Sequence, residues 1–550
     1  MSKRAGDGVQ RDAGARSVGF KVDRTLVLVI VCAVAMPLLL TRVGRLPWLL
    51  LFLGFTAAAV RYLLRRLPSR FRAQGVAALF VVVFYACGAL ININPEKIGS
   101  VDFADNTCFH SGLAESLLHG KLSLPVEPND QLLQSKNPYA LPRDFEYVWD
   151  ASYFEGKYYV YFGITPVLTT YLPFRLIAQR PLPTIVAIVI YLSAGFIGSL
   201  FVLERARRLC GFRLPSSTLQ VLSTLLLGFA TIAPVMLRRI SVYEVCIACA
   251  YCFWMWGSFL LLGQTSKMSR WAAPGGAVLA SLCMGLSAGS RPTFFATGLP
   301  LTLVLFLQAK RNWKPQRWAV FYRAVPLIGP FAICIALLGL YNKARFGSWT
   351  EFGTHYQLNL IDQFNMKFSS DKIWTGLAHY LFSWLLFTHQ FPPIRVDQTS
   401  HPFHLGNHPI SHEGVLGLFA TVPVSLLLAA TPFVAWYKRN RNFSWIVATL
   451  VGFATLMLLA VSVASVIPRY EMDFLPPLLL ASTLTFYATQ SRDTRAISVI
   501  SQVLWIPAAC YSVVIGLLAS IADSGTGTPD ALKTYYSGIY SLLRALLWWN

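Results

Sequence analysis

The chain has 550 residues, of which 55% are hydrophobic and only 13% are charged, and its mean hydropathy is +0.52. Soluble domains have about a quarter of their residues charged, so this composition excludes a soluble protein and predicts one that crosses a membrane many times. The net charge of +22 does not indicate nucleic-acid binding, because the surplus Lys and Arg lie in short segments between apolar runs and form no basic domain.

Apolar runs near the ~20 residues that a spanning helix needs recur along the chain, and we predict an all-α polytopic membrane protein with about thirteen transmembrane helices. The predicted spans are 25–41, 46–61, 75–92, 183–203, 215–235, 243–263, 271–288, 295–309, 319–341, 414–437, 443–466, 474–489 and 496–520. The predicted parts are a basic cytoplasmic tail (1–24), an N-terminal transmembrane hairpin (25–72), a membrane domain (73–520) and an external C-terminal tail (521–550). The run at 25–41 has no small-residue cleavage site, which favours a retained anchor over a cleaved signal peptide.

The orientation follows from the basic clusters between spans, which lie at 61–72, 205–213, 267–270, 310–317, 438–441 and 492–495. All of them face the cytoplasm if the N-terminus does, as the positive-inside bias requires. The long segments 93–182 and 342–413 then both become external loops. Within them, 160–179 and 373–392 are apolar and aromatic, and we expect amphipathic or re-entrant helices there.

The first external loop concentrates the acidic residues, since 10 of the 25 in the chain lie in 93–182. Asp102 and Asp105 stand at its start, three residues apart, so both can share one face of a helical turn. Asp105 has a structural alternative, the N-cap of a helix over LAESLL. A membrane protein that gathers carboxylates in one aqueous loop is expected to bind or react there.

Several cations violate the orientation bias at predicted outer span ends, notably Arg291, Arg345 and Arg469, in the contexts SRPTFF, YNKARFGSW and IPRYEMDF. Guanidinium groups suit phosphate because they donate two parallel hydrogen bonds. The alternatives are snorkelling to the interface and neutralisation by nearby carboxylates, among them Glu244 and Glu351.

Two further patterns favour structural interpretations. CIACAYC, with Cys246, Cys249 and Cys252, lies in an apolar run and is typical of small packing residues rather than of a metal site. The His-rich stretch 389–412 contains Pro402, Gly406 and Pro409, which prevent one helix from aligning the imidazoles, so a solvated loop is favoured over a metal site.

Four motifs in order resemble the GT-C class of polytopic glycosyltransferases, which includes protein mannosyltransferases and lipid A aminoarabinose transferases. They are Asp105 followed by LAESLLHGKL, DASYFEGKYYVYFGITP from Asp150 to Pro166, YNKARFGSWTEFGTHYQL from Tyr341 to Leu358, and RYEMDF from Arg469 to Phe474. Two departures are Ile164, where the family pattern has a proline, and the extra N-terminal hairpin.

The resemblance implies a sugar donor linked to polyprenyl phosphate, an acceptor that is a lipid or a glycan, and inversion at the anomeric carbon. It assigns the catalytic carboxylate, as base or metal ligand, to Asp105 with Asp102 as the competitor, and it leaves a divalent cation (Mg²⁺ or Mn²⁺) open. We predict donor-phosphate binding by Arg469, Arg345, Arg291 and Lys157. The predicted substrate-binding residues are Asp150, Tyr158, Tyr161, Tyr243, Glu244, Glu351, His355 and Tyr356.

The predicted location is a bacterial inner membrane with the active site facing the periplasm. Two other functions stay open. A flippase or transporter of a lipid-linked glycan is disfavoured because the polar residues gather in two outer loops and no internal repeat is evident. A polysaccharide ligase or polymerase is an enzyme with an oligosaccharide donor, which the sequence does not distinguish.

Overall fold

The structure is a computed structural model. It describes residues 67–92, 108–139, 146–238, 240–265, 274–311, 317–359, 371–387, 394–396, 414–464, 466–490 and 495–521, together with Ala58, Arg61 and Arg65. The basic tail, most of the predicted N-terminal hairpin, Asp102, Asp105, most of the His-rich stretch and residues 522–550 lie outside these ranges.

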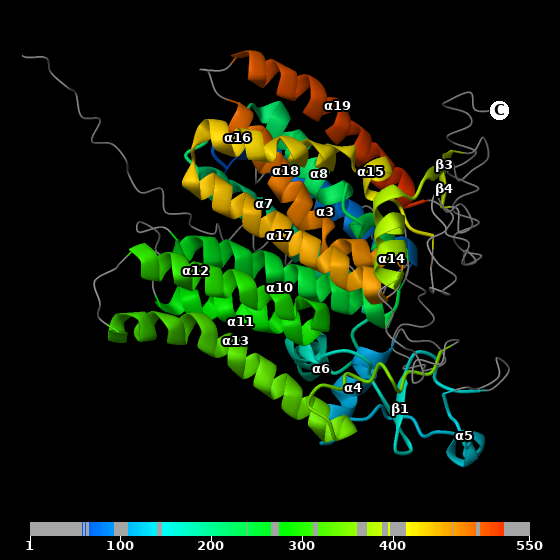
Figure 1. Ribbon diagram of the computed structural model, residues 1–550. Coiled ribbons are helices and arrows are strands. Elements are labelled where there is room, and N and C mark those ends of the chain that lie inside the picture. Colours follow the sequence, from blue (N-terminus) through cyan, green and yellow to red (C-terminus); the bar gives the residue numbers. More distant parts are fainter. Residues whose placement is uncertain are drawn as a thin grey trace, which may run out of the picture.

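Six of the described helices are long and apolar enough to cross a membrane. They lie in α3 (Ser69–Asn92), α7 (Thr184–Leu209), α10 (Val242–Gln264), α13 (Arg317–Phe346), α17 (Arg441–Ala464) and α19 (Arg495–Ala519). Shorter helices pack between them, namely α8 (Ser217–Phe229), α11 (Pro274–Ser290), α12 (Gly298–Arg311) and α18 (Leu475–Thr489). The predicted, mainly helical architecture is therefore confirmed (Figure 1), with six candidate spans among the described residues, whereas the count of thirteen spans is not.

Helix α10 lies at the centre of the bundle, since it packs on both α7 and α11 and most of its residues are buried. Small residues let these helices approach closely, because no side chain separates the backbones. A Cβ on Gly195 of α7 would lie 2.4 Å from the ring of Tyr251 on α10. Cys246, Cys249 and Cys252 are buried within α10 at these contacts, in agreement with their interpretation as packing residues.

Prolines explain why two predicted spans are broken. The stretch predicted at 414–437 contains α15 (Leu418–Thr421), the 3₁₀ helix η6 (Pro423–Ala430) and α16 (Thr431–Lys438), with Pro at the start of the last two. The stretch at 215–235 ends its helix at Phe229 and continues as α9 (Ala233–Met236), which contains Pro234. Proline starts a helix well but cannot continue one, because it lacks the N–H and clashes with the preceding turn.

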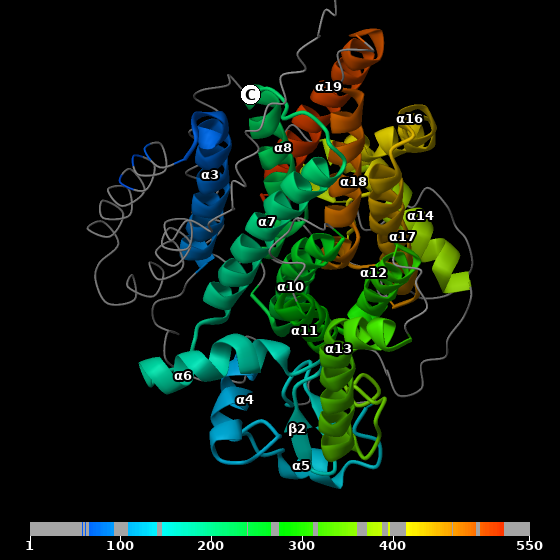
Figure 2. The ribbon, with the colours of Figure 1, turned by 90° about the vertical axis from the view of Figure 1, so that its left-hand side faces the viewer.

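A cap of short elements covers one end of the bundle (Figure 2). It contains α4 (Phe109–Leu118), α5 (Asp130–Gln134), strands β1 (Ser152–Phe154) and β2 (Lys157–Tyr159), the π-helical turn η3 (Val167–Tyr171) and α6 (Leu172–Ala178). Helix α6 runs across the direction of the long helices (Figure 2), and Arg175 on it pairs with Glu115 of α4 at 2.6 Å. Ile177 is 85% exposed, as expected for a helix that lies at a membrane interface.

The second predicted external loop contributes α14 (Asp371–Phe382), which packs on α17 and α15, and the hairpin of β3 (Leu385–Phe387) and β4 (Ile394–Val396). The stretch predicted as one apolar helix at 373–392 is thus a helix followed by a strand. Trp374 and Trp384 on this stretch are exposed, and exposed tryptophans are typical of membrane–water interfaces.

Candidate functional site

The site is organised by a short 3₁₀ helix, η7 (Pro468–Asp473), which links α17 to α18. A 3₁₀ helix has three residues per turn, so Tyr470 and Asp473 lie on the same face while Glu471 points elsewhere. Residues 469–473 are all buried. The motif RYEMD therefore places one cation and two carboxylates in the interior, where each needs a partner.

Arg291 is the partner of Asp473. It stands where α11 ends and the 3₁₀ helix η5 (Pro292–Thr297) begins, and its Nε lies 2.9 Å from Asp473 Oδ2 and 3.1 Å from Thr293 Oγ1. Its guanidinium carbon is 4.2 Å from the centre of the Tyr470 ring. The η7 turn thus holds Arg291 with an ion pair and a cation–π contact at once.

Arg469 points toward the start of α10. Its Nε lies 3.8 Å from Glu244 Oε1, and its guanidinium carbon lies 4.7 Å from the ring centre of Tyr243 and 5.7 Å from that of Tyr470. Ser241 is the N-cap of α10, and its hydroxyl donates to the Glu244 carboxylate. A carboxylate in the first turn suits the positive end of a helix dipole. The position of Glu244 is therefore fixed by α10 itself and does not depend on Arg469.

Gln357 connects Tyr243 to Asp150. Its Nε2 donates to the Tyr243 hydroxyl and lies 3.4 Å from Asp150 Oδ1. Asp150 has φ of 64°, a left-handed conformation that aspartate tolerates better than most residues. The Asp150 N–H donates to Leu358 O at 2.8 Å, and the Leu358 N–H donates to Ala151 O at 2.9 Å. Two motifs some 200 residues apart in the chain are therefore joined by backbone pairing.

Arg345 fastens the same loop from the end of α13. Its Nη1 donates to Val160 O at 2.7 Å and its Nη2 to Asn342 Oδ1 at 2.8 Å. The rings of Tyr341 and Phe346 lie 3.9 and 4.6 Å from its guanidinium carbon. Arg345 is thus buried and committed to the backbone just before Tyr161, whose ring lies 6.0 Å from that of Tyr243.

The structure brings together Asp150, Tyr161, Tyr243, Glu244, Arg291 and Arg469, with Arg345 beside them, and we call this set with Gln357, Tyr470 and Asp473 the buried cluster. Five other predicted residues lie apart from it. On β2, Lys157 is exposed and Tyr158 is buried. Glu351 pairs with His355 at 2.5 Å, and Tyr356 packs on Phe154 at 4.6 Å.

Sequence reasoning gave no role to Tyr470 or Gln357. Tyr470 is the second residue of RYEMDF, and Gln357 is the middle residue of YQL. Their positions inside these motifs were the only sequence signal that could have indicated a role. The sequence motifs do not indicate that Arg291 pairs with Asp473, because the two residues lie in separate sequence contexts. Cys108 occupies the N-cap position of α4, and Asp105 lies outside the described residues, so both interpretations of Asp105 stay predictions.

Burial dominates the electrostatics of η7. It raises the pKa of Asp473 to about 6, although the Arg291 guanidinium opposes the rise. It also raises the pKa of Glu471 well above the usual range, while a backbone hydrogen bond at Leu416 lowers it. Both directions follow from the cost of holding a charge away from water.

The cluster retains cationic donors. Arg291 Nη1 and Arg345 Nε are buried and have no hydrogen-bond partner among the described residues. Within the same residues, no group of three or more His, Cys, Asp or Glu side chains could hold a metal ion. The arrangement can therefore offer guanidinium N–H groups and aromatic faces to an anionic ligand that carries a ring.

No known family model matches the chain, and neither does any curated protein. Two solved structures of an oligosaccharyltransferase from Archaeoglobus fulgidus are similar to it. The apo form is 12% identical with a TM-score of 0.39, over 84% of this chain and 59% of that one. The form tethered to an acceptor peptide containing the NVT sequon is 11% identical with a TM-score of 0.40, over 84% and 58%. The chain thus spans less than three fifths of the length of these structures.

Proposed function

We propose that this protein is a GT-C-type membrane glycosyltransferase that moves a sugar from a polyprenyl-phosphate donor to a lipid or glycan acceptor at the outer face of a bacterial inner membrane, with inversion. One observation carries the proposal: the buried cluster unites residues from three of the four motifs that resemble this class. The first and last of those motifs lie more than 300 residues apart in sequence, yet the polar side chains of all three meet at one end of the bundle.

The donor phosphate is bound by Arg291 and Arg469, whose guanidinium groups both lie against the ring of Tyr470. Arg345 holds the 150–167 loop beside them and offers its Nε. A phosphodiester carries one negative charge, which suits a cluster in which carboxylates already neutralise part of the cationic charge. Lys157, an exposed cation on the neighbouring hairpin, contributes only positive charge near the phosphate.

The sugar packs against the aromatic rings of Tyr161 and Tyr243, with Asp150 and Gln357 as hydrogen-bonding partners for its hydroxyl groups. Tyr243 and Gln357 already hydrogen-bond each other, so the amide and phenol are pre-oriented. Glu244 keeps Arg469 over the Tyr243 ring. Among the remaining predicted substrate residues, Glu351 and the exposed His355 form a separate pair whose role is acceptor contact.

Asp105 is the proposed base, with Asp102 as its competitor. The acceptor hydroxyl loses a proton to this carboxylate as its oxygen bonds to the anomeric carbon, and the bond from that carbon to the phosphate oxygen breaks. The electron pair leaves with the lipid phosphate, whose charge the arginines stabilise. A divalent cation, if Asp105 held one, would stabilise the same charge. Asp105 precedes Cys108 by three positions, so the chain between their Cα atoms reaches about 11 Å at most.

The first experiment assays transfer from a polyprenyl-phosphate sugar to acceptor lipid extracts by purified protein in liposomes. Arg469→Lys and Arg291→Lys should each lower activity at least tenfold, because an ammonium group cannot reproduce the guanidinium fork. Arg205→Lys is the matched control: Arg205 also stacks on a ring, 4.2 Å from that of Phe259, but at the opposite end of α7 from the cap. Normal activity in both cluster variants would reject the phosphate site.

The second experiment distinguishes a glycosyltransferase from a polysaccharide ligase or polymerase and from a flippase. Lipid analysis of a deletion strain should reveal an accumulated polyprenyl-phosphate monosaccharide and a glycan that lacks one sugar. An accumulated lipid-linked oligosaccharide would favour a ligase or polymerase instead. Lipid-linked glycan confined to the cytoplasmic leaflet would favour a flippase.

The third experiment concerns Asp105 alone. Asp105→Asn preserves size but removes charge and basicity, and activity should fall by about 10²–10⁴ if this carboxylate is the base. Protein yield and membrane insertion should not change. Asp102→Asn is the parallel variant, and activity retained in Asp105→Asn but lost in Asp102→Asn would move the role to Asp102.

A further inference from the structure

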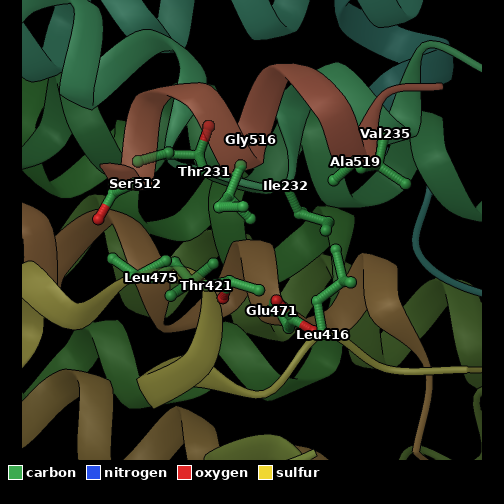
Figure 3. A pocket seen from close by; sticks show the side chains of 13 residues that line it. Thr231, Ile232, Val235, Leu416, Thr421, Glu471, Leu475, Ser512, Gly516 and Ala519 are labelled. Carbon is green, nitrogen blue, oxygen red and sulfur yellow. The ribbon is translucent and has the colours of Figure 1, made fainter. Parts of the chain in front are cut away.

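A second binding surface lies where α7 ends and α17 begins. Figure 1 shows α16, which directly precedes α17, far from the cap strand β1. The cavity beside Glu471, which Figure 3 shows between Leu416 and Gly516 of α19, is a different feature. Its volume is about 20 Å³, which is room for about one water molecule, so it is too small for an organic ligand.

The turn between α16 and α17 is fastened to the end of α7. Asn440 Nδ2 donates to Cys210 O at 2.6 Å, and the ring of Phe443 packs edge-on against that of Phe212 with their centres 5.6 Å apart. Arg439 stands in this turn with φ of 47°, a left-handed conformation that usually takes glycine at the end of a helix. Two segments 230 residues apart in the chain therefore form one fixed surface.

This surface is strongly cationic. The segments 204–213 and 438–442 together contain seven Lys or Arg residues but only one carboxylate, Glu204. Glu204 pairs with two arginines of its own helix, at 2.7 and 2.5 Å. Three exposed guanidinium groups have no carboxylate partner in the part of the chain that the structure describes, and we call them the cationic face: Arg213, Arg439 and Arg441. The surface therefore keeps a positive charge that an anion can neutralise.

Helix α16 continues the cationic face with aromatic rings. Phe433, Trp436 and Tyr437 are 56%, 68% and 46% exposed. Spacings of three and four residues place them on one side of the helix, and the ring centre of Phe433 lies 6.2 Å from that of Trp436 and 6.3 Å from that of Tyr437. The Lys438 ammonium lies 5.7 Å from the ring centre of Tyr437. The exposed rings thus lead directly into the basic turn.

Exposed rings beside guanidinium groups suit a ligand that is both apolar and anionic. A free phosphate ion would leave the rings in water, and a zwitterionic phospholipid would leave the charge of the face uncompensated. Tryptophan and tyrosine favour the boundary between bilayer and water, where Lys and Arg attract anionic lipids. We propose that this surface binds a phospholipid with a net negative charge, with its phosphate at the cationic face and an acyl chain along the rings of α16. In the predicted orientation this lipid comes from the cytoplasmic leaflet.

Binding of this lipid is independent of the proposed transferase activity, so the experiment measures lipid contact alone. The full-length protein in phosphatidylcholine nanodiscs receives a trace of a phosphatidylglycerol analogue with a diazirine near the ester of one acyl chain. After irradiation, labelled peptides are mapped by mass spectrometry. Label is expected in 431–438 well above that in α3. Unlabelled phosphatidylglycerol should compete, inorganic phosphate should not, and added salt should reduce the label.

The double substitution Arg439→Gln with Arg441→Gln tests the cationic face. Each basic side chain near a membrane surface strengthens the binding of anionic lipid about fivefold, so the label in 431–438 should fall about 30-fold. Arg70→Gln with Arg72→Gln is the matched control: it removes the same charge from two exposed arginines at the start of α3, which Figure 2 shows on the opposite flank from α16. The control should change the label less than twofold.

Phe433→Ala with Trp436→Ala tests the aromatic rings. The label should fall about fivefold, because part of the acyl chain loses its apolar contact, while the dependence on salt remains. All of the substituted side chains are exposed, so yield and thermal unfolding should match the wild type. The proposal is overturned if inorganic phosphate competes as well as phosphatidylglycerol, if both arginine variants lower the label equally, or if 431–438 is labelled no more than α3.

Discussion

At the residue scale, the charged side chains of the buried cluster are shielded from water and are compensated mainly by one another. Arg291 and Asp473 are both almost fully buried and lie 2.9 Å apart. An ion pair of this kind contributes little net stability, because desolvation offsets its attraction, but the loss of one partner leaves the other charge uncompensated. The pair therefore constrains which substitutions the protein can accept.

That constraint gives a prediction about stability. Arg291→Met should lower the free energy of unfolding by about 3–5 kcal/mol, because it leaves the Asp473 carboxyl buried without its partner. Adding Asp473→Leu to Arg291→Met should recover most of the loss, since both charges are then gone. Unfolding of the purified protein in detergent measures both, and a double variant as unstable as the two single losses combined would contradict the pairing.

The raised pKa of Asp473 predicts a pH dependence. Above about pH 6 its carboxylate is ionised and competes with the donor phosphate for Arg291; below that value the neutral carboxyl leaves the guanidinium to the phosphate. A phosphodiester keeps its single charge throughout this range. KM for the donor should therefore fall as the pH is lowered from about 7.5 to 5.5.

Asp473→Asn is the control, because an amide cannot ionise. In this variant the KM for the donor should be low at both ends of the pH range. A wild-type KM that is independent of pH, or one that rises on acidification in both proteins alike, would contradict the assignment.

At the element scale, the loop after β2 is pressed against the end of α11. A Cβ added to Gly163 would lie 1.8 Å from Gly289 O, which no local adjustment accommodates, so one backbone must move. Phe162, just before it, has φ of 90°, a conformation that few side chains adopt. The loop therefore fixes where Tyr161 stands relative to Arg291, two residues beyond Gly289.

Gly163→Ala should accordingly reduce transfer more than it reduces yield, because it displaces the loop from the cluster by more than an ångström. Gly275→Ala is matched to it: the same change at the start of α11, where a Cβ meets nothing within 4 Å, should be silent. Transfer assays and membrane protein yields distinguish the two, and wild-type activity in Gly163→Ala would show that the loop tolerates displacement.

The elements also show what sequence patterns can predict. The apolar runs at 183–203, 243–263, 443–466 and 496–520 correspond to α7, α10, α17 and α19, because hydrophobic length alone decides such helices. The same criterion failed at 414–437, where Pro423 and Pro432 divide an apolar run into short pieces. Composition cannot reveal β1 and β2 as a hairpin bonded to 353–358, since that pairing is made with a distant segment.

At the scale of the whole molecule, the predicted orientation stays a prediction with a direct test. Basic clusters place 93–182 outside and the loop at 438–441 inside. Reporter fusions at Ser100 and Asn440 should therefore report opposite sides of the membrane. A result in which both report the same side would require a different list of spans.

Only part of the candidate site could be predicted from the sequence, because the rest depends on contacts between distant segments. Orientation and motif position selected Arg291, Arg469 and Glu244 as outer-face charges, and the fold places them together. Their pairing depends on how α10, α11 and η7 pack, which local periodicity does not encode. A motif such as RYEMDF indicates that charges will be buried, but not which neighbour receives each one.

The ion pair across η7 also has a consequence for how the chain is made. Arg291 and Asp473 are 182 residues apart in the sequence. At roughly 5–20 residues per second, α11 is complete for about 9–36 s before the ribosome produces its partner. During that interval Arg291 is a cation at the end of an apolar helix with no carboxylate to receive it. A chain that stalls before η7 therefore keeps Arg291 without the carboxylate that accompanies its burial in the finished fold.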